Sequence, residues 1–184
     1  MCPPPPRGTR PVGPRRGGHR DEPAQQPPEA RAGPLLLLGL LGVCYAVAAI
    51  GGLASADAGG TYQSLDRPPW APPASLFGPV WTVLYGTVAV AAWLCLRRPA
   101  APLRPAMVWW AVQLGLNLAW TPLFFAAGQY GLAFADICLL LLALTATIIA
   151  FGRHRRAAAL LLLPYAAWVA YAAALNLDLW LDNA

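Results

Sequence analysis

The sequence predicts an all-α integral membrane protein: a bundle of five transmembrane helices that follows a disordered N-terminal tail. Three observations lead to this fold class. Hydrophobic residues make up 58% of the 184 residues and charged residues only 11%, less than half the roughly 25% of an average soluble domain. The apolar residues fall into long runs, and most of the charges lie between these runs. The runs do not alternate apolar and polar residues as transmembrane β-strands do.

The N-terminal tail, residues 1–33, is predicted to be disordered. It contains six arginines and nine prolines, no aromatic residue and very few apolar side chains. Such a segment cannot offset the entropy lost on ordering by burying apolar surface. The chain therefore divides into this tail and a membrane domain that covers residues 34–184.

The five predicted spans cover about residues 34–56, 76–96, 105–127, 130–151 and 157–181. Each is close to or above the roughly 20 residues that a helix needs to cross the hydrocarbon layer. The first span has a rival interpretation, because Ala54-Ser55-Ala56 resembles a signal-peptidase site. The apolar run and the region before it are both longer than those of a signal peptide, so we favour a retained span.

The distribution of arginine predicts the topology. All 13 basic residues are arginines, and placing the tail inside puts all of them except Arg67 on the inner side. Because basic residues concentrate in cytoplasmic segments, we expect a cytoplasmic N-terminus and an external C-terminus in a bacterial cell membrane. The net charge of +5 then reflects topology, and a nucleic-acid partner is not expected.

Several classes of site are not expected. The four cysteines form no CxxC pair, and the only histidines, His19 and His154, lie outside the predicted spans. These spacings support neither a metal site nor a disulfide framework nor a bis-histidine haem. The sequence also lacks a glycine-rich phosphate loop and a Ser/His/Asp set, so we expect no required cofactor.

The third predicted span has two distinct faces. Gln113, Asn117 and Trp120 share one face by their helical spacing. The opposite face carries the small residues Ala111, Gly115 and Ala119. Buried amides are costly unless they are paired, so the polar face is expected to line an internal cavity, although it could simply pack in the bundle. The small face is a candidate homodimer contact.

Two further spans carry aromatic faces. The second predicted span has Phe77, Trp81 and Tyr85 on one face, and the last has Tyr165, Trp168, Ala172 and Asn176. A flat, conjugated, mostly apolar ligand would fit between such faces. The alternative is an aromatic core without a ligand.

Two other features complete the interpretation. The segment 57–75 is rich in proline and contains Trp70, so it is read as a stiff lid over the bundle mouth or as a rigid connector. Asp136 is the one carboxylate well inside a predicted span. It follows the start of a helix, where the helix dipole favours an anion, so we interpret it first as structural or capping.

Several motifs in the right order resemble the TspO/MBR family of tryptophan-rich sensory proteins, which includes the translocator protein (peripheral benzodiazepine receptor). They are RPPWAPP at 67–73, FGPVWTVLY at 77–85, QLGLNLAWTPLFF at 113–125, LPYAAW at 163–168 and ALN at 174–176. The resemblance implies five transmembrane helices, a pocket under the first loop, homodimers and tetrapyrrole ligands such as protoporphyrin IX. For some members it also implies cholesterol or drug-like ligands.

The resemblance also implies a set of pocket residues: Tyr62, Trp81, Asn117, Trp120, Trp168 and Ala172. We add Tyr85, which shares the aromatic face of the second predicted span, and Arg67, whose charge could meet a ligand propionate at the pocket mouth, as candidate ligand-binding residues. Trp81 and Trp168 match tryptophans linked to porphyrin breakdown in the family. Arg67 stands where lysine is usual, and Leu132 replaces a tryptophan that contributes to drug binding in animal members. The last span lacks the basic residue of the cholesterol motif.

Three functions remain open from the sequence. The first is tetrapyrrole binding in porphyrin sensing, transport or metabolism. The second is light-dependent porphyrin degradation that uses Trp81 and Trp168 as redox-active side chains. The third is a membrane interaction protein without a small-molecule ligand.

Overall fold

The structure is a computed structural model that describes residues 32–54, 57–97 and 102–183. Most of the predicted tail lies outside these residues; Ala32 and Gly33 belong to the first helix. The described part of the chain is helical and contains no strand, which confirms the all-α prediction. Its elements are α1 (Ala32–Ala54), α2 (Ala58–Ser64), the 3-10 turn η2 (Ala74–Leu76), α3 (Phe77–Leu96), α4 (Arg104–Phe125), α5 (Tyr130–His154) and α6 (Arg156–Asn183).

The five long helices coincide with the five predicted spans. Four of them are long and apolar enough to cross a membrane within the described residues: α1, α3 with η2, α5 and α6. The 22-residue helix α4 is long enough but less apolar than these four, because Gln113 and Asn117 lower its mean hydropathy. Arg155 has an extended backbone (φ −153°, ψ 114°) and separates α5 from α6.

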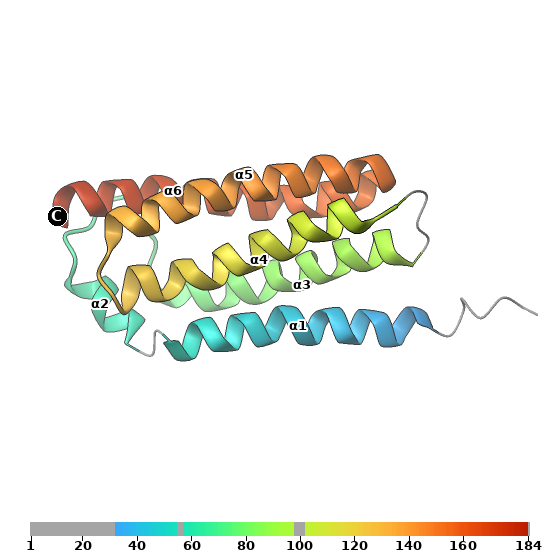
Figure 1. Cartoon of the computed structure of the whole chain (residues 1–184). Coiled ribbons are helices and arrows are strands. Elements are labelled where there is room, and N and C mark those ends of the chain that lie inside the picture. Colours follow the sequence, from blue (N-terminus) through green and yellow to red (C-terminus); the bar gives the residue numbers. More distant parts are fainter. Residues whose placement is uncertain (1–31, 55–56, 98–101, 184) are drawn as a thin grey trace, which may run out of the picture.

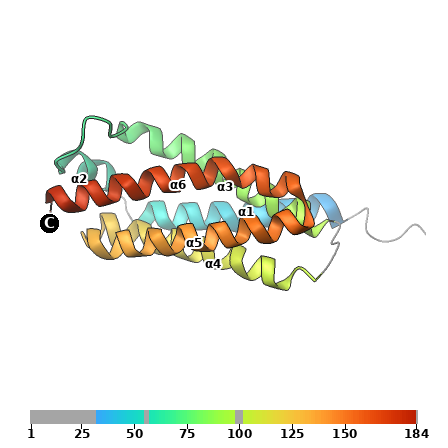
Figure 2. The same cartoon turned by 90° about the horizontal axis from the view of Figure 1, so that it is seen from above.

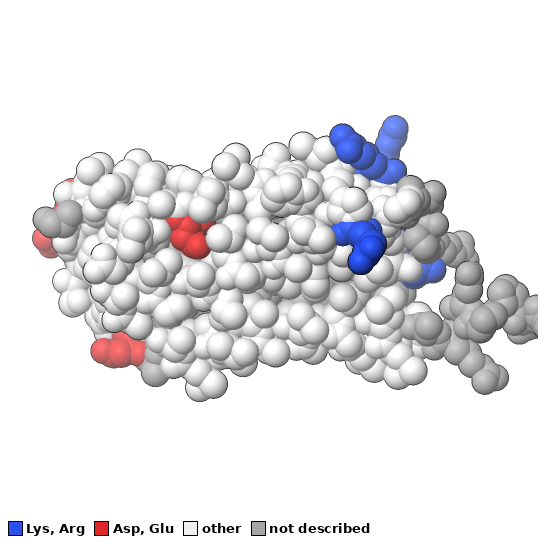
Figure 3. All heavy atoms as spheres, in the orientation of Figure 1, with Lys and Arg blue, Asp and Glu red and all other residues white. Residues whose placement is uncertain are grey.

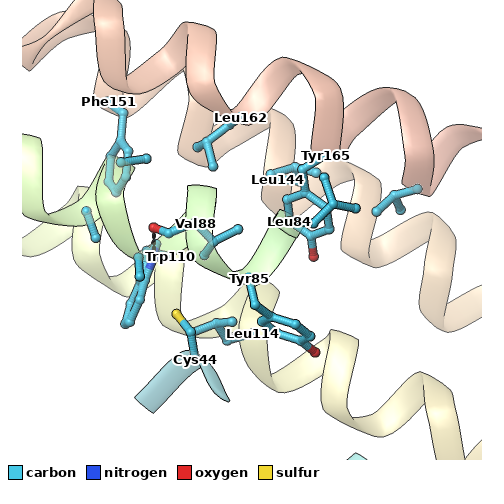
Figure 4. Close-up of a cluster of buried hydrophobic side chains, with 14 of the residues drawn as sticks. Cys44, Leu84, Tyr85, Val88, Trp110, Leu114, Leu144, Phe151, Leu162 and Tyr165 are labelled. Atoms are coloured by element: carbon cyan, nitrogen blue, oxygen red, sulfur yellow. Dashed lines mark hydrogen bonds between the residues drawn. The ribbon is translucent and has the colours of Figure 1, made fainter. Parts of the chain in front are cut away.

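The long helices form a closed ring in which each packs along two neighbours (Figures 1 and 2). Its order is α1, α3, α6, α5, α4 and back to α1. Figure 4 shows part of the core, where Cys44, Tyr85 and Leu114 meet from three different helices. α1 is the most peripheral member, because Leu40, Cys44 and Gly51 are its only buried residues within 33–54, where burial is described.

The lid, which we define as residues 57–73, differs from the stiff loop that the sequence suggested. It begins with the short helix α2, in which the Thr61 amide donates to the Asp57 carbonyl at 3.0 Å. Two glycines make a helix improbable from propensity alone. A Cβ at Gly60 would lie 2.7 Å from the Asp57 carboxylate, so a larger residue there would require the exposed Asp57 side chain to rotate. Residues 65–73 then continue as irregular chain past the end of α6.

The charged side chains are segregated along the bundle (Figure 3). Among described residues, the basic end carries Arg97, Arg104, Arg153, Arg155 and Arg156, at helix ends that lie together. The opposite end, with the lid and the end of α6, carries Asp57, Asp66, Asp178 and Asp182, together with Arg67. The middle of the bundle is almost free of charge, as a hydrocarbon environment requires.

Candidate ligand-binding site

A cavity of about 350 Å³ lies between α1, α3 and α4, beneath α2. This volume is near the lower end of the range for small-molecule pockets. It is lined by Ala48, Gly51, Gly52, Ala58, Gly59, Tyr62, Ala74, Phe77, Gly78, Trp81, Thr82, Tyr85, Asn117, Trp120, Thr121 and Phe125.

The lining has two contrasting walls. Five of its seven glycines and alanines come from α1 and α2, where Ala48, Gly51 and Gly52 share one face of α1. Aromatic rings dominate the side formed by α3 and α4. A Cβ added to Gly52 would meet no atom within 4 Å. Gly51, by contrast, packs on α4, because a Cβ there would lie 3.5 Å from the Thr121 hydroxyl. The cavity, which we call the slot, therefore remains where small residues face large rings, next to a packed contact between α1 and α4.

Tyr62 closes the slot from the lid and is almost fully buried. Its hydroxyl donates to the Pro72 carbonyl at 3.0 Å, and its ring meets the Phe77 ring edge-on at 5.3 Å. The Arg67 guanidinium lies over the same ring, 5.1 Å from its centre. Burial raises the pKa of the Tyr62 hydroxyl, and the Arg67 charge opposes that rise. Tyr62 therefore remains a neutral hydrogen-bond donor at pH 7.

A chain of buried hydrogen bonds forms the polar floor beneath the slot. The Tyr85 hydroxyl donates to Asn117 Oδ1 at 2.6 Å, and Asn117 Nδ2 donates to the Tyr165 hydroxyl at 2.8 Å. Tyr165 in turn donates to Gln113 Oε1 at 3.0 Å. Gln113 Nε2 completes the chain on the Trp110 carbonyl at 3.0 Å. These bonds tie α3, α4 and α6 together and satisfy amides that would otherwise be costly in this interior.

Five of the eight predicted ligand-binding residues line the cavity. They are Tyr62, Trp81, Tyr85, Asn117 and Trp120. Arg67 lies behind the Tyr62 ring and outside the lining. Ala172 lines a separate, much smaller cavity that shares Tyr62 and Trp120 with the main one.

Trp168 also lies outside the main cavity and behind Phe77, whose ring centre is 6.0 Å from that of Trp168. The Trp168 ring also contacts the Tyr171 ring, and the two ring centres are 5.6 Å apart. Its indole N–H is buried and has no hydrogen-bond partner among the described residues. The two candidate catalytic tryptophans are thus not equivalent, because only Trp81 borders the slot.

The amide at Asn176 joins helices and does not border the main cavity. Its Oδ1 accepts from the Trp120 indole N–H at 3.0 Å, and its Nδ2 donates to the Tyr130 carbonyl at 3.0 Å. These bonds orient the Trp120 ring, which stacks on Phe124 at 5.1 Å and borders the slot.

Two other predicted features lie apart from the slot. Leu132 lines a depression at the turn between α4 and α5, together with Trp180 and Asn183. Asp136 is buried in α5, and its Oδ2 has no partner among the described residues. The residue before α5, Gln129, makes no side-chain capping bond either, so the structure provides no capping contact for Asp136.

The contribution of α1 was missed by the reasoning from helical faces. Ala48, Gly51 and Gly52 lie in a run that is apolar on every side, so no face stood out. The one available signal was the spacing of the small residues at 48, 51 and 52, which resembles the small-residue stripe of the third span. In the first span this pattern marks a cavity wall.

Comparison with known proteins agrees with this architecture. The model of the TspO/MBR family matches residues 40–181. The translocator protein of Ovis aries is 42% identical over 125 residues, 66% of this chain and 74% of that protein. The tryptophan-rich protein TspO of Chlorobaculum tepidum is 38% identical over 140 residues, 74% of this chain and 88% of that protein. The tryptophan-rich sensory protein of Cereibacter sphaeroides is 33% identical over 143 residues, 78% of this chain and 88% of that protein. The chain therefore belongs to the TspO/MBR family and is a membrane protein.

Proposed function

We propose that this protein binds a tetrapyrrole such as protoporphyrin IX in the slot, and that it acts in porphyrin sensing, transport or metabolism. The observation that carries the proposal is the opposition of a glycine and alanine wall to an aromatic wall. A flat conjugated macrocycle can stack on Trp81 and Trp120 while its other face lies against the small residues. Burial and ring stacking then supply most of the binding energy.

The polar groups of the site support the same ligand. Asn117 uses one N–H and one oxygen lone pair in the floor network, which leaves capacity for a hydrogen bond to a ligand. Arg67, at the outer end beside Tyr62, could pair with a propionate that projects from the slot. Its present position behind the Tyr62 ring means that this pairing requires a rotation of its side chain.

The test of this function is a titration of purified protein with protoporphyrin IX, followed by quenching of fluorescence. Trp81→Ala and Trp120→Ala should weaken binding strongly because both rings border the slot. Trp168→Ala should weaken it less, since Phe77 stands between Trp168 and the cavity. Unchanged affinity in all three variants would exclude the slot, and a lack of saturable binding would favour an interaction protein without a ligand.

Light-dependent porphyrin degradation is the second candidate, and the position of Trp81 in the slot favours it. In this reaction the Trp81 indole would give an electron to the photo-excited porphyrin, and oxygen would be the final oxidant. Trp168 would act only through Phe77. Illumination of the wild type and of the Trp81→Phe variant separates the candidates, because equal decay of porphyrin absorbance in both would exclude a role for Trp81.

We further propose that α4 is the fifth span and that the N-terminus is cytoplasmic. The amides that lower the hydropathy of α4 are paired inside the ring, so they need not face lipid. The arginines at the basic end (Figure 3) support an inner position for that end, in a bacterial cell membrane. A C-terminal reporter that is active only in the cytoplasm would contradict this topology.

The small-residue face of α4 supports a homodimer as the assembly. Ala111 and Gly115 are exposed, and a Cβ at Gly115 would meet nothing within 4 Å. Such a surface permits close helix approach. Gly115→Ile should convert the dimer to a monomer in cross-linking experiments, whereas Gly39→Ile on the outer side of α1 should not.

A further inference from the structure

The lid is fastened to a helix that contributes nothing to the main cavity. Asn183, near the end of α6, accepts a hydrogen bond from the Asp66 amide at 3.0 Å and donates one to the Asp66 carbonyl at 3.1 Å. Its second N–H bonds the Leu179 carbonyl at 2.9 Å, which fixes the side chain on its own helix. A side-chain amide presents a donor and an acceptor in one plane, which suits such a paired contact.

A second fastening lies farther along both segments. The Tyr171 hydroxyl on α6 donates to the Trp70 carbonyl at 2.9 Å. The Trp70 ring meets the Tyr171 ring edge-on at 5.6 Å. Trp70 itself is 46% exposed, so this contact holds the lid against α6 without burying it. Together the two contacts bracket residues 66–70, and Arg67 lies between them.

The same stretch of lid contacts Tyr62, the residue that borders the slot from the lid. Arg67 covers the Tyr62 ring, and the Tyr62 hydroxyl bonds Pro72 just beyond Trp70. Tyr62 borders the slot, whereas neither Asn183 nor Tyr171 does. If residues 66–70 leave α6, Tyr62 loses the segment that supports it from behind.

We propose that Asn183 is a positioning residue that, with Tyr171, latches the lid shut and so sets the rates at which a ligand enters and leaves the slot. The assignment of a gate rests on the proposed ligand-binding function. The hold of Asn183 on the lid does not, because it rests on the hydrogen bonds to Asp66 alone. We expect the latch to be closed both with and without ligand. Releasing it should then raise the association and dissociation rates of the ligand together and change the affinity little.

The first measurement is hydrogen exchange at the Asp66 amide in ligand-free protein. Asn183→Leu removes both bonds to the lid. A hydrogen bond typically contributes a factor of about five to an equilibrium, so exchange should accelerate roughly 25-fold. Tyr171→Phe removes one bond and keeps the ring, and should accelerate exchange in the 66–70 segment about fivefold. Asp182→Leu is the matched control, because this neighbouring side chain is exposed, and it should have no effect.

The second measurement is stopped-flow quenching with protoporphyrin IX. Asn183→Leu should increase the association and dissociation rates by similar factors, while Asp182→Leu behaves as wild type. A residue needed only for folding would reduce the amount of folded protein and would not accelerate association. Asn183→Gln, which keeps the amide, should restore slow exchange at least in part.

Two results would overturn the proposal. Wild-type exchange at Asp66 in Asn183→Leu would show that Asn183 does not hold the lid. Faster exchange with unchanged porphyrin rates would show that the lid is held but is not the gate. If wild-type protein does not bind protoporphyrin IX at all, the proposed function fails, and the exchange measurement still decides whether Asn183 holds the lid.

Discussion

The hydroxyl of Tyr165 should be the most important single polar atom for the stability of the bundle. It accepts from Asn117 and donates to Gln113, and all three side chains are at least 96% buried. Tyr165→Phe removes one oxygen and leaves both partners short of a bond. Buried hydrogen bonds inside membrane proteins average about 0.6 kcal/mol, and a buried polar atom left unpaired costs about 1–3 kcal/mol. We therefore expect a loss of about 2–3 kcal/mol in the free energy of unfolding.

Two further Tyr→Phe variants calibrate this figure. Tyr85→Phe breaks one bond to Asn117, whose oxygen borders the cavity and can be hydrated, so about 1 kcal/mol is expected. Tyr45→Phe breaks an exposed bond to the Thr82 carbonyl and should cost about 0.5 kcal/mol. The assay is reversible denaturation in mixed micelles without ligand. If Tyr165→Phe costs no more than Tyr45→Phe, the buried network does not hold the helices together.

Two other predictions follow from local geometry. Gly131→Ala should destabilise the protein by about 1 kcal/mol, because its Cβ would lie 2.9 Å from the Trp180 ring. A Cβ at Gly39 would meet no atom within 4 Å, so Gly39→Ala should stabilise α1 by up to about 1 kcal/mol. Thermal melting should therefore show a lower melting temperature for Gly131→Ala and a higher one for Gly39→Ala. Arg67→Gln should raise the pKa of Tyr62 further, since burial then acts without the opposing charge. NMR titration of labelled tyrosine measures this shift, and an unchanged pKa would contradict the contact.

The fold was largely predictable because hydrocarbon imposes a simple rule. A helix that crosses it must be long and apolar, so the long apolar runs of the sequence identify the long helices directly. The same rule explains why α4 is not among the four helices that are apolar enough to cross a membrane. Gln113 and Asn117 make it less apolar than the other long helices, and only the tertiary structure shows that partners on α3 and α6 satisfy them.

The site was predictable only where helical spacing groups distinctive residues. Trp81 and Tyr85 on α3, and Asn117 and Trp120 on α4, were placed on inward faces by spacing, and they do line one cavity. Trp168 was placed on an inward face by the same reasoning, but the Phe77 ring separates it from the cavity. Helical spacing predicts the direction of a side chain and not its distance from a cavity. Which helices border the slot depends on the packing order of the ring, and a helical wheel carries no information on that order.

The lid shows a second limit of sequence reasoning. Its prolines predicted a restricted chain, but the contacts that hold it involve backbone groups of Asp66 and Trp70. Backbone groups have no sequence signature. Asn183 and Tyr171 therefore gave no sign of their role, since each could have been an ordinary polar residue near the end of a membrane helix.

The most direct test of the slot is protoporphyrin IX binding to Gly52→Leu. This change places a side chain in the space between the two walls, where a Cβ meets no atom within 4 Å, and it leaves every aromatic residue and the floor network in place. Gly39→Leu, on the same helix but outside the cavity lining, is the control. We expect affinity to fall at least about tenfold in Gly52→Leu, equivalent to about 1.4 kcal/mol, with thermal stability no lower than that of the wild type, because glycine disfavours a helix. Wild-type affinity in Gly52→Leu would show that the ligand does not lie between these walls.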